Sequence, residues 1–354
     1  MKILFQIPFK ETLYAERTIY NAYKDAFIDL AHTFKTLTAN DNCKKVFEEF
    51  DPDIFMTSLN SYYLKFLNLD IIRKYRKKGL VVFVGLPFWN SPLSMTRINE
   101  TYSLSKNKKF VDLIKSDSFG DVYCNTCEPE DPRMDGFEKE TGYKYYTILL
   151  GADKINLKAE FSEKFKTDIS FIGTYLPQKR DYFRKYVFPL KKKYDLAIYG
   201  QDWGILDRTL GWVQRGGQYF NIPYIKSLRK LKLKLEDEAK IYNSSLISIN
   251  IHEDFQVRFG GDCNERTFKI PFCGGFEITD NVACIRKYFK NGEEIVIAEN
   301  EKDWYEKVDY YIKNPNKRNA IIEAGKKKVL AEHTYHNRVN QVIDIYDKIK
   351  RCKK

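Results

Sequence analysis

The segment between Leu246 and Asp280 constrains the fold of this chain more than any other feature. Leu246–His252 is apolar and rich in β-branched residues, which predicts a buried strand. Glu236–Asn243 before it predicts a helix. A polar-started helical turn from Asn264 and a strand over Phe276–Thr279 are expected after it. This order is typical of α/β construction around a parallel sheet, in which ligands bind beyond the carboxyl ends of the strands.

The same alternation runs through the whole chain, whose 354 residues suit two domains of roughly 150–200 residues each. In the N-terminal half we expect strands at Lys2–Ile7, Lys35–Thr38, Asp53–Ser58, Leu80–Val84, Gly120–Cys124 and Tyr145–Leu150. In the C-terminal half we expect them at Asp168–Gly173, Asp195–Gly200, Leu246–Ile251, Phe276–Thr279 and Glu294–Ile297. Helices are expected at Glu16–Phe34, Asn42–Phe50, Leu67–Lys78, Glu236–Asn243, Trp304–Lys313, Lys317–Leu330 and Asn337–Lys350. Polar sequence from Lys154 to Lys166 separates the two series, so we predict domains at 1–158 and 159–336, followed by a C-terminal helix at 337–354.

The glycine pair Gly274–Gly275 is a candidate phosphate site. Glycines let a ligand approach the backbone closely, and a helix N-terminus aimed at that gap would offer unpaired N–H groups to an anion. His252, Glu253, Asp254 and the turn Asn264–Arg266 are expected at the same edge of the sheet. The alternative is ordinary turn chemistry between two elements.

The charge balance indicates an anionic partner. The formal net charge is +12, from 60 basic and 48 acidic side chains, and residues 314–354 hold eleven Lys or Arg against four Asp or Glu. Further basic clusters lie at 73–78, 191–193 and 226–234. Each cluster alone fits a solvated helix face. Together they favour a sugar nucleotide, an acidic membrane surface or nucleic acid.

The apolar runs and the cysteines point to a cytoplasmic protein, with peripheral membrane contact left open. The longest apolar run, Gly79–Trp89, is too short to span a bilayer, and Met1–Pro8 is expected to be a first strand rather than a signal sequence. Cys124 and Cys127 have metal-like spacing, but no second Cys/His pair accompanies them. Because a zinc site needs four ligands, we expect no metal site.

Several segments of the second half, in order, resemble one family. They are Phe171–Thr174 with Lys179–Arg180, Ile198–Trp203, Tyr242–Leu246, Asn250–His252, Asn264–Asp280, Gly292–Val296 and Ala324–Tyr335. This ordered set resembles the CgeB/YkvP-like glycosyltransferases of the GT-B group, with a glycosyltransferase group 1-type C-terminal domain. The resemblance runs from about Asp168 to Arg338.

The resemblance implies a GT-B architecture, with two Rossmann-like doubly wound domains facing a central cleft. It implies a nucleotide-diphosphate sugar, such as a UDP- or GDP-sugar, as co-substrate held mainly by the C-terminal domain. The acceptor would be held by the N-terminal domain, and the last helix would cross back to that domain. It also implies that no metal or other cofactor is obligatory.

Without a metal, the negative charge on the departing diphosphate must be met by backbone N–H groups, Lys or Arg. The residues expected to bind the donor are Gly173, Thr174, Lys179, Arg180, Tyr199, Gly200, Trp203, His252, Asn264, Arg266, Thr267, Gly274 and Gly275. Packing or salt-bridge roles are the alternative for the aromatic and charged members. Related enzymes usually carry a glutamate, which holds the donor ribose, where this chain has Lys269. A lysine cannot accept those hydroxyl hydrogen bonds, so Glu265 or Glu277 would have to substitute, or the donor is held differently.

The candidate catalytic residues follow predicted strands or begin the next helix. They are Glu11 and Glu16 after the first strand, Asn125 after a later one, and His252 in the second half, with Asn90 as a further candidate. An inverting mechanism would need a carboxylate or imidazole base beside the acceptor hydroxyl, whereas a retaining mechanism could do with less. The residue pattern leaves both open.

Three functions are compatible with the sequence. The first is transfer of a sugar to a hydroxyl of a surface glycan, a lipid-linked acceptor or a protein. The second is transfer to a hydroxymethylated base of phage-type DNA, for which an extrahelical base would have to enter the site. The third is a catalytically inactive protein that binds sugar nucleotides or carbohydrate, which Lys269 would permit.

Overall fold

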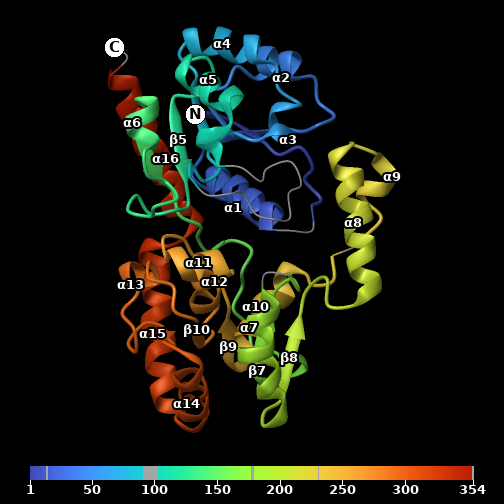
Figure 1. The fold of residues 1–354 in the computed structure, drawn as a ribbon, viewed down its shortest axis with the longest axis vertical. Coiled ribbons are helices and arrows are strands. Elements are labelled where there is room, and N and C mark those ends of the chain that lie inside the picture. Colours follow the sequence, from blue (N-terminus) through green and yellow to red (C-terminus); the bar gives the residue numbers. More distant parts are fainter. Residues whose placement is uncertain (13–14, 91–102, 177–178, 230, 353–354) are drawn as a thin grey trace. The chain divides into compact units, whose positions relative to one another are not determined.

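The chain forms two compact units, each built on one parallel sheet (Figure 1). The computed structural model describes residues 1–12, 15–90, 103–176, 179–229 and 231–352. The first unit comprises Met1–Leu149 with His336–Lys354, and the second comprises Leu150–Tyr335. The division therefore falls at 149/150 and 335/336, where the sequence pattern suggested 158/159 and 336/337.

The sheet of the first unit has six parallel strands in the order β2-β1-β3-β4-β5-β6. The strands are β1 (Lys2–Gln6), β2 (Thr33–Leu37), β3 (Ile54–Ser58), β4 (Val81–Gly85), β5 (Val122–Asn125) and β6 (Tyr145–Thr147). The helices are α1 (Ala15–Asp29), α2 (Cys43–Phe50), α3 (Ser61–Leu64), α4 (Leu69–Lys77), α5 (Lys108–Lys115), α6 (Phe137–Thr141) and α16 (Tyr335–Cys352).

Local sequence explains where these elements form. Val81–Val84 in the middle of the sheet is almost completely buried, as expected for a parallel strand covered on both faces. Asn42, Asn60 and Asn68 each accept a backbone N–H of the first turn of α2, α3 and α4, so an asparagine caps each of these helices.

The sheet of the second unit has five parallel strands in the order β11-β10-β9-β7-β8. The strands are β7 (Thr167–Ile172), β8 (Leu196–Tyr199), β9 (Ser245–Asn250), β10 (Glu277–Thr279) and β11 (Val296–Ile297). The helices are α7 (Arg180–Tyr182), which continues into a π turn and a 3₁₀ turn up to Lys192, α8 (Ile205–Tyr219), α9 (Pro223–Lys226), α10 (Leu235–Ser244), α11 (Asp254–Phe259), α12 (Arg266–Phe272), α13 (Ile285–Tyr288), α14 (Glu301–Lys313) and α15 (Pro315–Glu332). The core of this unit lies between the sheet and its covering helices, around Phe171, Ile247, Ile249 and Trp304.

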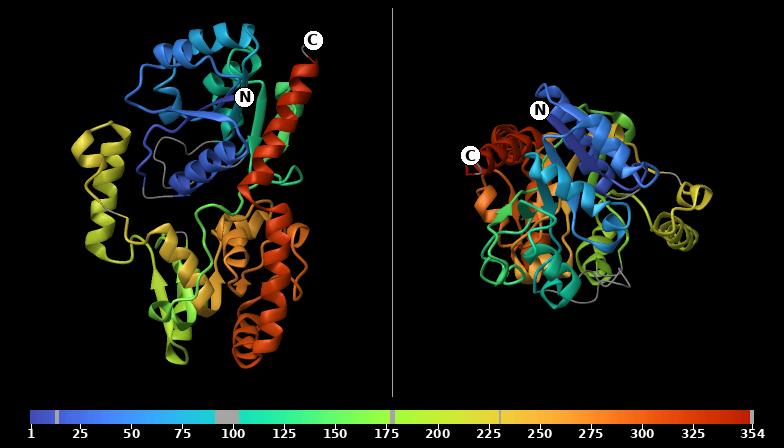
Figure 2. Two further views of the ribbon diagram at one scale, coloured as in Figure 1. Left: turned by 180° about the vertical axis from the view of Figure 1, so that it is seen from behind. Right: turned by 90° about the horizontal axis from the view of Figure 1, so that it is seen from above.

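The prediction of an α/β fold with two parallel sheets is confirmed. Each expected strand is present, with ends displaced by at most three residues, and each expected helix is present. Helices α3, α5, α6, α11 and α13 were not expected, and neither were α8 and α9. The last two form a hairpin that stands out from the sheet of the second unit (Figure 2). None of the helices in the described ranges has the length and apolar character needed to cross a bilayer.

Candidate donor site in the second unit

The strand order of the second unit places a topological switch point between β7 and β9. The chain passes from β7 to β8 on one side of β7, and then returns to β9 on its other side. Connections on the two sides of such a point diverge, leaving a crevice at the carboxyl ends of the strands where open α/β sheets bind their ligands. Gly173 and Thr174 follow β7 at this edge, and Ile251 and His252 follow β9.

Two cations meet at this edge. Lys179 Nζ donates a hydrogen bond of 3.1 Å to the carbonyl oxygen of Ile251, and Arg266 NH2 donates one of 3.0 Å to the same oxygen. The Lys179 side chain is buried. Burial, reinforced by the nearby positive charge of Arg266, lowers the pKa of Lys179 to about 7. A carbonyl oxygen supplies only a partial negative charge, so this pair of cations is suited to receive an anion.

The guanidinium of Arg266 is held in place by groups that converge on Asn250. Arg266 Nε donates to Asn250 Oδ1 at 3.0 Å, and Asn264 Nδ2 donates to the same oxygen at 2.9 Å. The guanidinium also lies over the ring of Phe171, 5.5 Å from its centroid. A Cβ atom on Gly173 would lie 3.2 Å from Arg266 NH1, so the remaining nitrogen of the fork faces the end of β7.

Glu277, on the neighbouring strand β10, accepts a hydrogen bond from the side chain of Asn250. Asn250 Nδ2 donates to Glu277 Oε1 at 2.8 Å, while Glu277 Oε2 has no hydrogen-bond partner among the described residues. Burial raises the pKa of Glu277 to about 8. The side chain is therefore largely a neutral acid at pH 7. Asn250 was part of the matched segment but not of the predicted site. Its position as the last residue of β9 is the only sequence signal for it.

The loops after β7 and β8 are joined through backbone contacts at two glycines. A Cβ on Gly200, whose φ is +124°, would lie 2.2 Å from the carbonyl oxygen of Gly173, so only glycine fits there. Trp203 Nε1 donates to that oxygen at 2.9 Å, and the N–H of Gly173 donates to the carbonyl of Tyr199. These contacts fix the loop after β7 and the loop after β8 in position relative to each other.

The remaining residues predicted at this edge lie around that point. Thr174 precedes Tyr175, whose ring is 5.5 Å from the guanidinium of Arg180 at the start of α7. The half-buried ring of Tyr199 packs edge-on against Phe165, with the ring centroids 6.2 Å apart. Tyr199 and Trp203 thus make core contacts, which was the alternative for them.

His252 is fully buried and both of its ring nitrogens have partners. Nδ1 lies 2.5 Å from Asp280 Oδ1, and Nε2 lies 3.2 Å from Thr267 Oγ1. Asp280 also accepts the backbone N–H of His252 at 2.9 Å. His252 and Thr267, both predicted donor ligands, therefore hold the end of β9 and the start of α12 together. This arrangement is that of a satisfied structural histidine.

Lys269, in the position where related enzymes carry glutamate, lies in a buried ionic cluster. Its ammonium is 2.8 Å from Glu265 Oε2 and 3.5 Å from Glu238 Oε1. The two carboxylates raise the pKa of Lys269 despite its burial, so it stays charged. Glu265 also accepts a hydrogen bond of 2.7 Å from the Tyr335 hydroxyl. Glu265 is thus committed to Lys269 and Tyr335.

Gly274 and Gly275 lie away from this edge. They close the C-terminal end of α12, where their N–H groups donate to the carbonyls of Pro271 and Ile270. Gly274 has a φ of +71°, the left-handed conformation that ends a helix, and β10 begins two residues after Gly275. Both amides are used by the helix, and they lie at the opposite end of β10 from Thr279 and Asp280. The structure therefore places the pair in the turn that was the alternative to a phosphate site.

The candidates in the first unit are dispersed. Glu11 lines an open cavity of about 430 Å³ together with Arg17, Lys24 and Tyr20, and Glu16 lies in the first turn of α1. Asn125 ends β5, three positions from β1 in the sheet, and its Oδ1 accepts the N–H of Cys127. Asn90 donates to the carbonyl of Asp135. Asn125 and Asn90 therefore fix loops.

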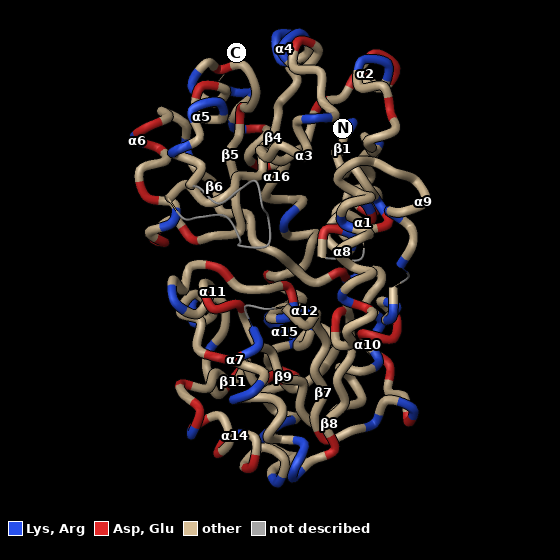
Figure 3. The backbone as a smooth tube through the Cα atoms, turned by 45° about the vertical axis from the view of Figure 1, so that its right-hand side comes forward, with Lys and Arg blue, Asp and Glu red and all other residues tan. Residues whose placement is uncertain are grey.

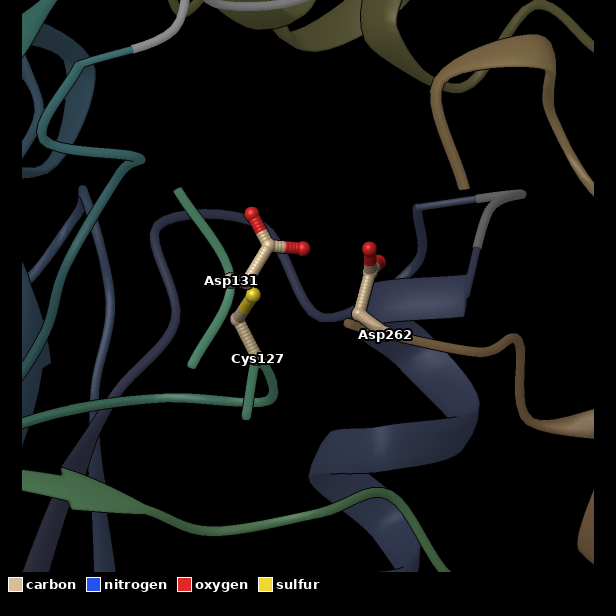
Figure 4. A group of neighbouring side chains, drawn as sticks. All are labelled: Cys127, Asp131 and Asp262. Atoms are coloured by element: carbon tan, nitrogen blue, oxygen red, sulfur yellow. The ribbon is translucent and has the colours of Figure 1, made fainter. Parts of the chain in front are cut away.

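Cys127 and Asp131 lie on the loop after β5 (Figure 4). Asp131 accepts hydrogen bonds of 2.9 and 2.7 Å from the guanidinium of Arg133 and one of 2.8 Å from its backbone N–H. The guanidinium also contacts the sulfur of Cys127 at 3.7 Å. Arg133 lowers the pKa of Asp131 despite its burial. The buried carboxylate is thus neutralised by an arginine of its own loop. Asp262, the other side chain drawn, belongs to the second unit and accepts a hydrogen bond from Gln256.

Comparison with known proteins agrees with this architecture. Residues 180–344 match the Glycosyl transferase-like family. No curated protein matches the sequence. An alpha-glucosyltransferase in complex with UDP-glucose and DNA containing an abasic site is 11% identical with a TM-score of 0.64, over 98% of this chain and 99% of that one. HepE from Anabaena, in complex with UDP and glucose, is 12% identical with a TM-score of 0.62, over 98% and 100% of the two chains. Starch Synthase IV from Arabidopsis thaliana, bound to ADP and acarbose, is 10% identical with a TM-score of 0.64, over 99% of each chain.

These matches extend over both units. At such low identity they establish the fold, which is GT-B. The family match adds a glycosyl transferase-like domain that contains Arg180, the α8–α9 hairpin, β9 and α12. The narrower CgeB/YkvP-like resemblance stays a prediction. The chain thus has the GT-B fold, and residues 180–344 match the Glycosyl transferase-like family.

Proposed function

We propose that this protein transfers a sugar from a nucleotide-diphosphate sugar to a hydroxyl acceptor without an obligatory metal. The observation that carries the proposal is the pair Lys179 and Arg266, which converge on the Ile251 carbonyl at the switch point between β7 and β9. The relatives in the comparison include structures bound to UDP-glucose, UDP and ADP, which supports a nucleotide donor.

In this proposal the diphosphate lies beside Arg266 and Lys179. The acceptor oxygen forms a bond to the anomeric carbon, the bond from that carbon to the diphosphate oxygen breaks, and the acceptor proton passes to a carboxylate base or to solvent water. The nucleoside diphosphate leaves with the bonding electron pair, and the two cations stabilise the charge that develops on it. Arg266 is positioned beforehand by Asn250 and Glu277, so little reorganisation accompanies the reaction.

Donor chemistry and metal independence are tested together. The protein is titrated with UDP, GDP and ADP by thermal shift and calorimetry, in EDTA and then in Mg²⁺. The matching sugar nucleotides are then screened for release of the nucleoside diphosphate. We expect one nucleotide to raise the melting temperature in EDTA, with release of the same nucleotide from its sugar. Failure of every nucleotide to bind would refute the donor site, and binding that needs Mg²⁺ would refute metal independence.

A second candidate has DNA as acceptor. It is favoured by the match to a glucosyltransferase in complex with DNA and by the net charge of +12. DNA binding driven by phosphate contacts weakens steeply with salt. Retention on duplex DNA containing hydroxymethylated bases, followed from low to physiological salt, separates this acceptor from glycan, lipid-linked and protein acceptors.

A further inference from the structure

The hairpin of α8 and α9 has the reverse of the usual surface-helix pattern. Eleven of the seventeen exposed large hydrophobic side chains in the described ranges lie between Ile205 and Leu231. They are Ile205, Leu206, Leu210, Trp212, Val213, Tyr219, Phe220, Ile222, Tyr224, Leu228 and Leu231. A surface helix normally turns its apolar stripe toward the core. Here that stripe faces outward, and a patch of this kind marks an interaction site.

The inner side of the hairpin is made of glycine and polar groups. A Cβ on Gly217 would lie 2.5 Å from Ile225 Cγ2, so the two helices touch where α8 has no side chain. Gln214 is buried, and its Nε2 donates to the carbonyl of Lys226 at 2.9 Å. Small residues and hydrogen-bonding side chains between helices, with apolar side chains outside, are the packing found where lipid surrounds a helix pair.

Charged side chains gather at the base of the hairpin. Arg229 donates to Asp207 at 2.7 Å and to Asp202 at 2.8 Å, and Lys232 pairs with Asp207. This network ties the hairpin to the loop after β8. These ion pairs fix the orientation of the hairpin, and of its apolar face, relative to the sheet of the second unit.

The charges of the segment are mostly positive. Residues 204–234 contain seven Lys or Arg and a single acidic residue, Asp207, which the network at the base uses. Figure 3 colours the basic and acidic positions of the described residues along the backbone. Aromatic side chains such as Trp212 and Tyr224 favour the boundary between lipid headgroups and acyl chains. Basic residues beside an apolar face add attraction to anionic lipid. Nucleic acid would use the cations but leave the apolar face exposed to water.

We propose that the α8–α9 hairpin docks the protein on an anionic phospholipid bilayer, with Leu206, Trp212 and Tyr224 inserted into the interfacial layer. These three side chains are 80%, 69% and 89% exposed. Helix α8 has 15 residues and is shorter than the roughly 20 that span a bilayer, so the hairpin lies in one leaflet. The inference concerns a surface outside the donor site and does not depend on the donor.

Flotation of the full chain with vesicles tests the proposal. We expect binding to phosphatidylcholine vesicles that contain phosphatidylglycerol, and weaker binding to phosphatidylcholine alone. Replacing Leu206, Trp212 and Tyr224 together by Ser should lower the partition coefficient by about tenfold or more, because the apolar area that enters the lipid is lost. The matched control replaces Phe161, Tyr310 and Leu330 by Ser, three exposed apolar residues elsewhere in the second unit, and should float like the unmodified protein.

Trp212 reports the contact directly. Trp89 and Trp304 are buried and Trp203 is half-buried, so lipids brominated in the acyl chain should quench the fluorescence of Trp212 selectively, and Trp212→Phe should remove that quenching while binding persists. Equal flotation of the triple variant, or no flotation of the unmodified protein, would overturn the proposal. If acrylamide fails to quench Trp212 in the absence of vesicles, the apolar face of the hairpin is covered by another part of the chain or by a second copy of the chain. Sedimentation velocity distinguishes these two cases, because only the second copy raises the mass of the particle. If the unmodified protein binds duplex DNA but not vesicles, and the triple variant loses DNA binding, the face belongs to a nucleic-acid site.

Discussion

The two units have the same kind of sheet but differ in what lies at their switch points. In the second unit, the buried side chains of Lys179, Asn250 and Glu277 and the half-buried Arg266 are connected by hydrogen bonds at the carboxyl ends of β7 and β9, with Lys179 and Arg266 sharing the Ile251 carbonyl. In the first unit, the switch point lies between β1 and β3, and Glu11 after β1 lines an open cavity on the other side of β1, between α1 and β2. A network whose members hold one another is formed before ligand arrives, whereas a solvated carboxylate depends on its ligand for position. The comparison predicts that nucleotide binding belongs to the second unit and that the first contributes to turnover.

The largest effect on the reaction rate is expected from a substitution in the first unit. If Glu11 is the base, Glu11→Gln should lower the rate of sugar-nucleotide hydrolysis by about 10²–10⁴-fold and leave the affinity for the nucleoside diphosphate unchanged. Glu16→Gln, in the first turn of α1, is the matched control. Steady-state release of the nucleotide measures the hydrolysis rate, and calorimetry measures the affinity for the nucleoside diphosphate. A loss of nucleotide affinity in Glu11→Gln would break the division between the units, and a larger loss of rate in Glu16→Gln would move the base from the loop after β1 to α1.

Arg266→Ala should weaken binding of the nucleoside diphosphate by about 100-fold, or about 2–3 kcal/mol, because a charge-assisted, positioned donor is lost. Arg286→Ala, which removes an exposed arginine paired with Glu299, should leave the affinity unchanged. Calorimetry at one ionic strength measures both. Equal affinities for the two variants would place the donor away from the switch point.

Nucleotide affinity should fall as pH rises through the pKa of Lys179, which lies near 7 in the free protein. Lys179 is a cation below this pH and a neutral amine above it, while the terminal phosphate, with a pKa near 6, is already ionised. We expect a loss approaching about tenfold per pH unit between pH 7.5 and 9. Lys179→Arg keeps the charge and should flatten the profile. A profile of the unmodified protein as flat as that of Lys179→Arg would show that the amine does not meet the diphosphate.

The smallest effect concerns the free energy of unfolding. Burial raises the pKa of Glu277 to about 8, so the native state retains a proton that the unfolded state releases above its usual pKa near 4.5. This contribution to stability is complete below pH 4.5 and declines as pH rises toward 8, by about 1.4 kcal/mol per pH unit at most. Lys179 has the opposite sign above pH 7, and His32, whose pKa is lowered by burial, contributes below it, so Glu277 is isolated by the difference in slope between the unmodified protein and Glu277→Gln from pH 5 to 7. Urea unfolding should show that slope reduced in Glu277→Gln, and an unchanged slope would show that Glu277 is ionised in the native state.

Most of the fold was predictable because buried parallel strands carry apolar, β-branched sequence, continuous in Val81–Val84 and interrupted only by Ser248 and Asn250 in Leu246–Ile251. Helix α8 was not predictable, because its apolar residues face outward and its inward side holds Gly211 and Gly217. A rule that assigns the apolar face to the core does not find such a helix.

The site was predictable only in part. Arg266 and Lys179 were expected at the sheet edge, but their meeting on the Ile251 carbonyl joins Lys179 to a group 72 residues away. Local spacing does not contain that information. Gly274 and Gly275 show the opposite case, since the same residue pair serves a helix end and a ligand loop, and only the position of β10 separates the two.

The way the α8–α9 hairpin is assembled also bears on how such a protein changes over evolutionary time. Its two helices are joined through glycines, a buried glutamine and ion pairs, and the outward side chains contribute little to that joint. Substitutions on the outward face can therefore alter what the hairpin recognises while leaving the folding of the second unit nearly untouched. Under the docking proposal, substitutions among the hairpin's eleven outward side chains would change the surface that the protein contacts and leave the residues at the sheet edge unchanged.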